Sequence, residues 1–452
     1  MLACELLNSE KRHPWTITSP LTLAREPSRR KSTRQQAPTV ILGMPPVIIR
    51  LTSDGTKYPI TLLATQNWGI EHDPSWITPE RTASGCLLAV SDMIVSAREH
   101  DWGGLKQTAS GVGWHVWRYR DYDTPVHCHC VPEVLKLERK CIYGGRCEAI
   151  RTGRFSERMY HLDFRGLYPF VASIAQTPCA LVRRGASRPA ELYAGEDPRA
   201  GYIAQVRVVD PAGIYPSREA GKTVYQAGPK DTVLCGDELR RAVRCGHVVS
   251  VGGWAEYRLG DPLRRTLDRW RSLRAESGES GSVSTARLCK AAANGLIGRF
   301  AARESRWEYV PDGASDVPFG EWYSPTRSGR PEKRRALDWT VWREIDDGIG
   351  PDAVPILNAW ITSAARSRLW DAMSVCPAGS LWYTDTDSLI VTKAGYDALH
   401  AAGWVRHGID GYLTIREIAD EGEIYGPKHY RFGPRLCYGG VAQDEDCQYP
   451  VW

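Results

Sequence analysis

The chain has 452 residues, of which 42% are hydrophobic and 25% charged, so it has enough material for a sizeable core spread over several structural units. Its formal net charge of +5 is mild, and the total charge therefore does not by itself indicate a nucleic-acid partner. The start is polar, and the longest apolar run near it, residues 40–51, is broken by prolines and too short to span a bilayer. We therefore expect a soluble, cytoplasmic protein with no signal peptide and no membrane partner.

The thirteen cysteines are scattered without a repeating framework, so we expect reduced thiols. Residues 127–130 read His-Cys-His-Cys, and Cys141 and Cys147 follow. No Cys-x-x-Cys pair accompanies them, so chance clustering is favoured over a structural zinc site.

The N-terminal third carries little recognisable chemistry. Residues 1–38 are rich in Arg, Ser and Pro and lack periodicity, which predicts a flexible basic tail. Such a tail would contact phosphates non-specifically or be simply solvated. Short β-like runs between Gly and Pro breaks follow, up to about residue 123, with a helix predicted near residues 87–100.

Residues 132–262 predict a mixture of helices and strands. Pro132 opens a helix whose one face carries Val134, Leu137 and Cys141. The segment 161–169 then reads as a strand that runs into a turn set by Pro169. Strands are expected over 204–209 and 248–257, and a helix over 234–245.

Residues 263–300 predict two helices joined by the polar segment 276–281. The first carries an apolar stripe bordered by arginines. The stripe residues are Leu263, Leu267, Trp270 and Leu273. The second helix begins at a Ser284 or Thr285 cap and carries Arg287 and Lys290 one turn apart. These two cations would face the same way and could hold a triphosphate; the alternative is a solvated basic face.

Residues 301–350 are rich in Trp, Pro and Gly, with β-like runs at 307–309 and 339–342. The apolar spacing from Ile356 to Leu369 then predicts an amphipathic helix that backs a sheet.

The run Leu381–Val391 predicts a strand, a two-residue bend and a second strand. Such a hairpin places Asp385 and Asp387 at an exposed tip, where two carboxylates repel each other unless a cation neutralises them. Mg²⁺ is the natural partner for these oxygen ligands. Taken alone, an acidic β-turn explains the same residues equally well.

Three segments together resemble the polymerase motifs of family B DNA polymerases. Residues 383–388, Tyr-Thr-Asp-Thr-Asp-Ser, resemble the third motif. Residues 163–169, Asp-Phe-Arg-Gly-Leu-Tyr-Pro, resemble the first, whose core is Asp-x-x-Ser-Leu-Tyr-Pro. Residues 290–298, Lys-Ala-Ala-Ala-Asn-Gly-Leu-Ile-Gly, resemble the second, Lys-x-x-x-Asn-Ser-x-Tyr-Gly. Three matches in the family's order make coincidence a poor explanation.

Two further elements extend this resemblance, the first of them to the protein-primed branch of the family, which serves phages and mobile elements. Tyr143-Gly144-Gly145-Arg146 resembles its Tyr-x-Gly-Gly element, and Lys428 with Tyr430 resembles the Lys-x-Tyr element at the root of the thumb. The interval between the first two motifs is long enough for the insertion that contacts a terminal protein in this branch. A terminal protein is therefore a further candidate partner.

The resemblance implies an α/β (α+β) right-hand fold with an antiparallel-sheet palm, two-helix fingers, a short thumb and a small N-terminal domain. The boundaries expected are a tail at 1–38, a degenerate exonuclease-like domain at 39–131, a palm with an inserted region at 132–262, fingers at 263–300, a palm with an insertion and the catalytic hairpin at 301–395, and a palm end with a rudimentary thumb at 396–452. No Asp-x-Glu exonuclease motif occurs anywhere in the chain, so proofreading is not expected.

The implied activity is DNA-directed addition of deoxynucleotides to a primer 3′ end by two-metal phosphoryl transfer. Primer-template DNA and dNTPs are the implied partners, and two Mg²⁺ ions the cofactors, with Mn²⁺ a second candidate. Asp163 and Asp387 would bridge the metals, Asp385 would support them, and Phe164 would add its backbone carbonyl. The residues expected to bind nucleotide are Tyr168, which would exclude a 2′-hydroxyl, Arg287, Lys290 and Asn294. Those expected to bind DNA are Tyr143, Gly144, Gly145, Arg146, Thr386, Lys428 and Tyr430.

Two departures from the motifs leave alternatives open. Gly166 replaces the usual Ser of the first motif, and Ile297 replaces the Tyr of the second, which puts fidelity and nucleotide affinity in doubt. A catalytically impaired polymerase remnant that only binds DNA is the main rival. A reverse transcriptase is a weaker one, because Thr386 separates aspartates that are adjacent in that class.

Overall fold

The computed structural model describes residues 48–53, 56–61, 99–102, 108–188, 192, 199–219, 221–279, 283–316, 318–325, 332–350 and 352–438. These residues form two compact units. The first contains the described parts of Trp117–Ser272 and Val354–Trp452, and the second those of Thr16–Val116 and Leu273–Ala353. The tail predicted at 1–38 and most of the helix predicted near 87–100 lie outside the described residues. The finer division into six segments stays a prediction.

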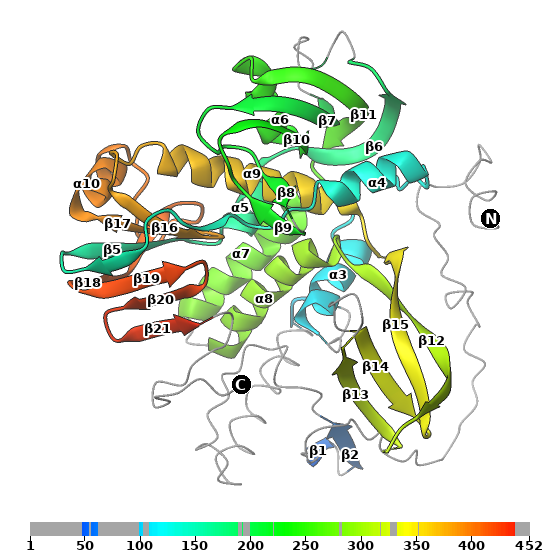
Figure 1. Ribbon diagram of the computed structural model, residues 1–452. Helices are drawn as coiled ribbons and strands as arrows, with labels where there is room; N and C mark the ends of the chain where they lie inside the picture. Colours follow the sequence, from blue (N-terminus) through cyan, green and yellow to red (C-terminus); the bar gives the residue numbers. More distant parts are fainter. Residues whose placement is uncertain are drawn as a thin grey trace. The chain divides into compact units, whose positions relative to one another are not determined.

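A five-stranded antiparallel sheet carries the first and third motifs in the first unit (Figure 1). Its order is β18 (Leu413–Ala419), β5 (Met159–Phe164), β17 (Ser388–Thr392), β16 (Leu381–Asp385) and β3 (Cys147–Ala149). The predicted hairpin is confirmed, because β16 and β17 pair with only two residues between them.

A second sheet packs on this one through aromatic side chains. Its strands are β21 (Arg435–Tyr438), β20 (His429–Phe432), β19 (Gly422–Gly426) and β4 (Gly153–Phe155). One buried cluster draws on both sheets; its members are Phe155, Met159, Trp382, Tyr383, Ile390, Ala419, Ile424, Tyr430 and Phe432. The hairpin strands β16 and β17 are buried along most of their length, and a register shift between Leu381 and Tyr383 accompanies the entry of both Trp382 and Tyr383 into this core.

The segment after β5 differs from the prediction. Helix α5 (Leu167–Ile174) begins where a turn set by Pro169 was expected. Pro169 lies in the first helical turn, where the missing N–H would have no intrahelical partner. Gly166, just before the helix, has a φ of 57°, a left-handed conformation that favours glycine. The first motif therefore ends in a helix, and Tyr168 belongs to its first turn.

The helix predicted from Pro132 is confirmed as α4 (Pro132–Lys140), and the helix predicted from Ile356 is confirmed as a helix but is not amphipathic. It is α9 (Pro355–Met373), and its side chains are buried on nearly all sides. It packs mainly against α4, α5, α6 (Gly236–Arg244) and strands β6 (Thr177–Gly185) and β10 (Gly228–Cys235). A helix enclosed on all sides loses the polar face that marks a surface helix.

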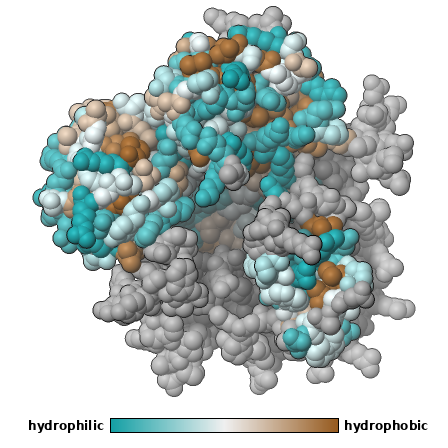
Figure 2. All heavy atoms as spheres, viewed as in Figure 1, coloured by the Kyte–Doolittle hydropathy of each residue, from teal (hydrophilic) through white to brown (hydrophobic). Residues whose placement is uncertain are grey.

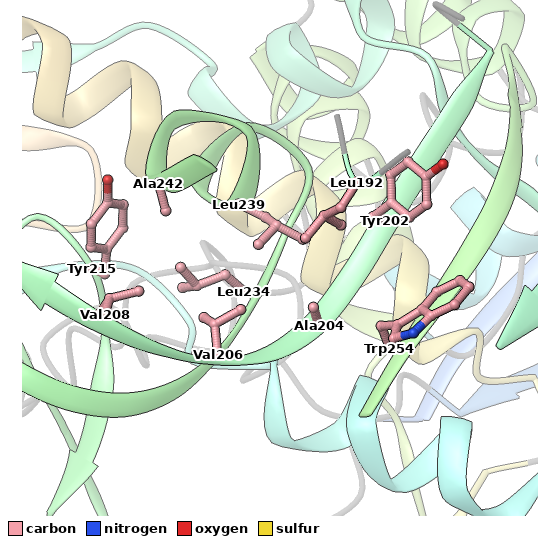
Figure 3. Close-up of a cluster of buried hydrophobic side chains, with 10 residues drawn as sticks. All are labelled: Leu192, Tyr202, Ala204, Val206, Val208, Tyr215, Leu234, Leu239, Ala242 and Trp254. Atoms are coloured by element: carbon pink, nitrogen blue, oxygen red, sulfur yellow. The ribbon is translucent and has the colours of Figure 1, made fainter. Parts of the chain in front are cut away.

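The insertion between the first two motifs forms a third sheet. Its order is β10, β7 (Ala200–Asp210), β11 (Val248–Gly260) and β6. Helix α6 covers it, and Figure 3 shows Leu239 and Ala242 of this helix directed at Val206, Val208 and Leu234. The helix expected over 234–245 starts only at Gly236, because β10 continues to Cys235. A small hairpin, β8 (Ser217–Glu219) with β9 (Lys222–Val224), and helix α10 (Lys393–Ala401) complete the first unit.

The second unit contains a four-stranded antiparallel sheet where the Trp-rich segment was noted. Its order is β12 (Arg303–Ala314), β15 (Thr340–Ile349), β14 (Glu332–Leu337) and β13 (Phe319–Ser324). Helix α8 (Val283–Arg299) and the short pair β1 (Ile48–Ser53) and β2 (Thr56–Thr61) belong to the same unit.

Two further helices differ from the sequence prediction. Helix α7 (Arg264–Glu279) extends through most of the linker expected at 276–281. Helix α3 (Ala109–Tyr119) lies where only β-like runs were expected. An added Cβ at Gly113 of α3 would lie 2.3 Å from the carbonyl oxygen of Ala292, so α3 packs tightly on α8.

Hydrophilic residues cover much of the visible face of the first unit, with hydrophobic ones in smaller patches between them (Figure 2). Among the described helices, none combines the length and apolar character needed to cross a membrane.

Candidate active site

The tip of the β16–β17 hairpin is a tight turn held by its own polar groups. The Asp387 N–H donates to the Asp385 carbonyl at 2.6 Å, and the Ser388 hydroxyl donates to the same oxygen at 3.1 Å. Thr386 has a φ of 63°, which is unfavourable for a β-branched residue and costs on the order of 1–3 kcal/mol. The aspartates are half-buried rather than exposed, since the Asp385 side chain is 20% accessible.

Asp163 lies next to this tip. In the pairing of β5 with β17, Asp163 is opposite Ser388, and the N–H of Phe164 donates to the carbonyl of Asp387 at 2.7 Å. On its other side, the Asp163 carbonyl accepts from the hydroxyl of Thr414 at 3.2 Å. Strand pairing thus brings the first and third motifs to the same end of one sheet.

The two carboxylates and the backbone carbonyl at this end of the sheet suit a divalent cation that also binds substrate. Among the described residues, no group of three His, Cys, Asp or Glu side chains is arranged to hold a metal alone. Mg²⁺ is commonly held by only one or two carboxylates together with substrate phosphates. Asp163 and Asp387, with the backbone carbonyl of Phe164, match that requirement.

Asp385 has a different partner. The ammonium of Lys428 lies 3.0 Å from both of its carboxylate oxygens. Lys428 occupies the turn between β19 and β20 with a φ of 57°, and its N–H donates to the Tyr383 hydroxyl at 2.8 Å. Burial lowers the pKa of Lys428, but the bond to Asp385 outweighs it, so the pKa is raised and the lysine stays charged. This pairing suits the supporting role expected of Asp385.

The Tyr143–Arg146 loop contacts the hairpin tip. The N–H of Thr386 donates to the carbonyl of Arg146 at 2.6 Å. A Cβ built on Gly145 would lie 2.8 Å from both the Tyr168 hydroxyl and Cγ2 of Thr386. Only glycine fits there without displacing these groups, so steric crowding explains why position 145 of this motif is a glycine.

Tyr168 approaches this site from α5. Its hydroxyl is enclosed, and burial raises its pKa to about 12, against the opposing effect of the Arg366 guanidinium. The hydroxyl therefore stays protonated at neutral pH, close to the backbone of Gly145 and Thr386.

Three residues predicted to bind DNA have buried side chains. Tyr143 donates to or accepts from the Thr232 hydroxyl at 3.0 Å. Arg146 is 4% exposed, bonds to Glu148, and lies over the ring of Tyr225 at 4.2 Å. Tyr430 belongs to the core between the two sheets. The structure gives these side chains a positioning role, and a direct DNA contact stays a prediction.

The second motif forms one exposed face of α8. Arg287, Lys290 and Asn294 are all exposed, as their spacing of three and four residues requires. Ile297 is 3% exposed and lies inside the second unit, off this face. Gly295 is explained by packing, because an added Cβ would meet the backbone of Ser110 at 2.8 Å. The approach of this face to the aspartates stays a prediction.

The sequence reasoning missed a buried ion pair behind the site. Arg366 of α9 donates two hydrogen bonds to Glu238 of α6, and a third to the carbonyl of Gly144. Arg366 shares α9 with Arg368 and Asp371, so the sequence offered no signal that singled it out.

The His-Cys tract has a simpler structural role. His129 hydrogen-bonds Glu138 at 2.9 Å, and Glu138 accepts from the Tyr257 hydroxyl at 2.6 Å. The cysteines at 128, 141 and 147 are free thiols.

These helices and antiparallel sheets form a mixed fold similar to that of a DNA polymerase, and the residues of the first and third motifs meet at one end of its five-stranded sheet. Several structures of phi29 DNA polymerase are among the similar solved structures. Its complex with primer-template DNA and incoming nucleotide matches with a TM-score of 0.55 and 15% identity, over 78% of this chain and 63% of that one. Its binary complex with primer-template DNA matches at 0.54 and 16%, over 80% and 63%. An orthorhombic crystal form matches at 0.51 and 16%, over 74% and 58%.

The chain thus spans about three fifths of the length of the polymerase structures it matches. No protein-family model matches the sequence, and no curated protein does. At identities of 14–16% the likeness is one of fold, and it agrees with the resemblance seen in the motifs.

Proposed function

We propose that this chain is a DNA-directed DNA polymerase that adds deoxynucleotides to a primer 3′ end by two-metal phosphoryl transfer. The observation that best supports this proposal is the pairing of β5 with β17, in which Asp163 lies opposite Ser388 and the Phe164 N–H bonds to the carbonyl of Asp387. The end of β5 and the turn that precedes β17 thereby bring Asp163 and Asp387, which are distant in the chain, close together.

Each of the site's residues has a task in this proposal. Asp163 and Asp387 hold the two Mg²⁺ ions, which when bound lower the pKa of the primer 3′-hydroxyl and neutralise the triphosphate. Lys428 compensates the charge of Asp385. Lys290 and Arg287 supply phosphate contacts from α8, and Tyr168 screens the sugar. No protein nucleophile is needed, because positioning and electrostatics carry phosphoryl transfer.

The partners follow from the same proposal. Primer-template DNA and dNTPs are the substrates, with the half-buried backbone of Gly144 and Gly145 facing template phosphates. Priming by a terminal protein is a narrower proposal that rests on the third sheet, β10-β7-β11-β6, which occupies the interval where the protein-primed branch carries its insertion.

Primer extension tests the proposal directly. The purified chain is incubated with a 5′-labelled primer-template, the four dNTPs and Mg²⁺, beside samples with EDTA or Mn²⁺. We expect extension that depends on the metal. Asp387→Asn should reduce the rate about 1,000-fold or more, because losing a shared ligand removes several kcal/mol of transition-state stabilisation.

The matched control is Asp397→Asn, the same chemical change at an exposed ion pair with Lys393 on α10. It should leave extension unchanged. DNA affinity, measured by fluorescence anisotropy, should be similar for all three proteins, because phosphate contacts by Lys and Arg dominate binding. Near wild-type incorporation by Asp387→Asn would refute the assignment. A wild-type chain that binds DNA but never extends it would favour the binding-only alternative.

A further inference from the structure

A buried ion pair lies directly behind the Tyr143–Arg146 loop. Arg366 is 3% exposed and Glu238 2%. The Arg366 Nε and Nη2 donate to the two carboxylate oxygens of Glu238 at 2.8 and 2.6 Å. Desolvating two charges costs several kcal/mol, and apolar replacement of such pairs is often neutral or stabilising. Stability alone therefore does not explain an arginine at this place.

The third hydrogen bond of Arg366 points to a role. Its Nη1 donates to the carbonyl oxygen of Gly144 at 2.7 Å. Because two hydrogen bonds to the carboxylate of Glu238 fix one edge of the planar guanidinium, the N–H groups on Nη1 have little freedom in direction. The pair thus holds the backbone of the glycine loop at a set distance from α6 and α9.

The loop is held from behind at a second point as well. The Tyr143 hydroxyl accepts from the N–H of Val233 at 3.1 Å, and the backbone carbonyl of Tyr143 accepts from the Thr223 hydroxyl at 3.1 Å. The Arg366 guanidinium also lies 5.6 Å from the centre of the Tyr143 ring. All of these groups belong to the first unit.

The front of the same loop contacts the site. Gly145 approaches the Tyr168 hydroxyl and Thr386 so closely that no side chain fits between them. A shift of the loop by a few tenths of an ångström toward or away from α9 would therefore move Gly145, the residue that packs against the Tyr168 hydroxyl.

We propose that Arg366 and Glu238 are positioning residues that fix the Tyr143–Arg146 loop against Tyr168, and thereby set how strictly the sugar of the incoming nucleotide is selected. This inference rests on the proposed polymerase function. In this proposal neither Arg366 nor Glu238 contacts the substrate, because both act through the backbone of Gly144.

The test uses a variant that keeps the fold and removes the donor. In Arg366→Met with Glu238→Leu, the buried charges are replaced together by apolar groups, so no unpaired charge remains. The matched control is Arg241→Met with Asp371→Leu, because Arg241 and Asp371 join the same helices, α6 and α9, at 2.7 Å through more exposed side chains. A third protein, Arg366→Lys, keeps the charge but has one ammonium in place of the planar fork.

Three quantities are measured for each protein. The first is the ratio of kcat/KM for a deoxynucleotide to that for the matching ribonucleotide. The second is amide hydrogen exchange in the peptide that contains residues 143–146 and in the peptide that contains Thr386. The third is the thermal unfolding midpoint, which reports folding.

We expect the Met/Leu variant to fold, to lose about tenfold in the selectivity ratio, and to exchange the 143–146 amides faster, as expected when a hydrogen bond from a charged donor is lost. Arg366→Lys should change both quantities in the same direction by less, and the Arg241/Asp371 control should change neither. A folded Met/Leu variant with wild-type selectivity and exchange would overturn the proposal.

The other outcomes are also decisive. If the Met/Leu variant does not fold, Arg366→Lys with wild-type exchange at 143–146 would refute the positioning role. If the wild-type chain incorporates no nucleotide, the proposed function fails, while the exchange comparison still tests whether the pair fixes the loop.

Discussion

Tyr168 shows how much a single side chain depends on its surroundings here. Its hydroxyl is enclosed beside Gly145 and Thr386, which holds the ring in one place at the start of α5. Tyr168→Ala should increase ribonucleotide use relative to deoxyribonucleotide use, because the group that would meet a 2′-hydroxyl is removed. Matched single-turnover assays with dNTP and rNTP measure the change, and an unchanged ratio would mean that another group is the gate.

His161 predicts a pH dependence of stability. It is 1% exposed, and neither ring nitrogen has a hydrogen-bond partner among the described residues. Burial, with Arg416 and Arg435 near, lowers its pKa to about 3 in the folded state, against an ordinary value of 6.5. The unfolded chain therefore binds a proton at this site between pH 6.5 and 3 when the folded chain does not, so stability falls as the pH drops through this range.

The measurement is urea unfolding at pH 7 and pH 4 for the wild type and His161→Leu. The histidine should account for roughly 3 kcal/mol of the wild-type loss at pH 4, and the variant should lack that part. Equal losses in both proteins would show that His161 does not titrate as its burial implies.

At the scale of one element, the Tyr143–Arg146 loop is predicted to tolerate change at one glycine and not at its neighbour. Gly145→Ala would place a Cβ 3.0 Å from Cα of Thr386, so the hairpin tip must move. Gly144 has a φ of 78°, but an added Cβ there would meet nothing within 4 Å. Gly144→Ala should therefore cost only about 1–2 kcal/mol of backbone strain.

Primer extension and thermal unfolding of the two variants separate the effects. Gly145→Ala should lose about tenfold or more in extension rate, because small displacements of reacting groups are costly. Gly144→Ala should lose stability with less effect on rate. Equal extension by both variants would contradict the close contact of this loop with the site.

At the scale of the whole chain, the prediction is that this protein does not proofread. Tyr119 with Asp123 is the nearest match to an exonuclease motif, and no Asp-x-Glu accompanies it. In the structure Tyr119 ends α3 and both side chains are exposed. A 3′-mismatched primer incubated with Mg²⁺ and no nucleotides should therefore stay at full length. Shortening by the wild type, and not by Asp123→Ala, would overturn this prediction.

The sequence by itself determined the local elements of the site. The hairpin at 381–391, helix α4 and the common face of Arg287, Lys290 and Asn294 all follow from short-range periodicity. Motif order also indicated that Asp163 and the hairpin belong to one site. Such inferences succeed because neighbours in the chain settle them, through a two-residue bend or a helical repeat.

Only the tertiary structure decided what surrounds those elements. Arg366 and Glu238 are 128 residues apart, and no local pattern joins them. Helix α9 is enclosed by α4, α5 and α6, so its polar residues do not mark a surface. Arg146 and Tyr430 read as exposed DNA contacts in sequence, yet both are buried. Burial and ion pairing depend on which distant segments pack together, as α6 and α9 do where Glu238 meets Arg366.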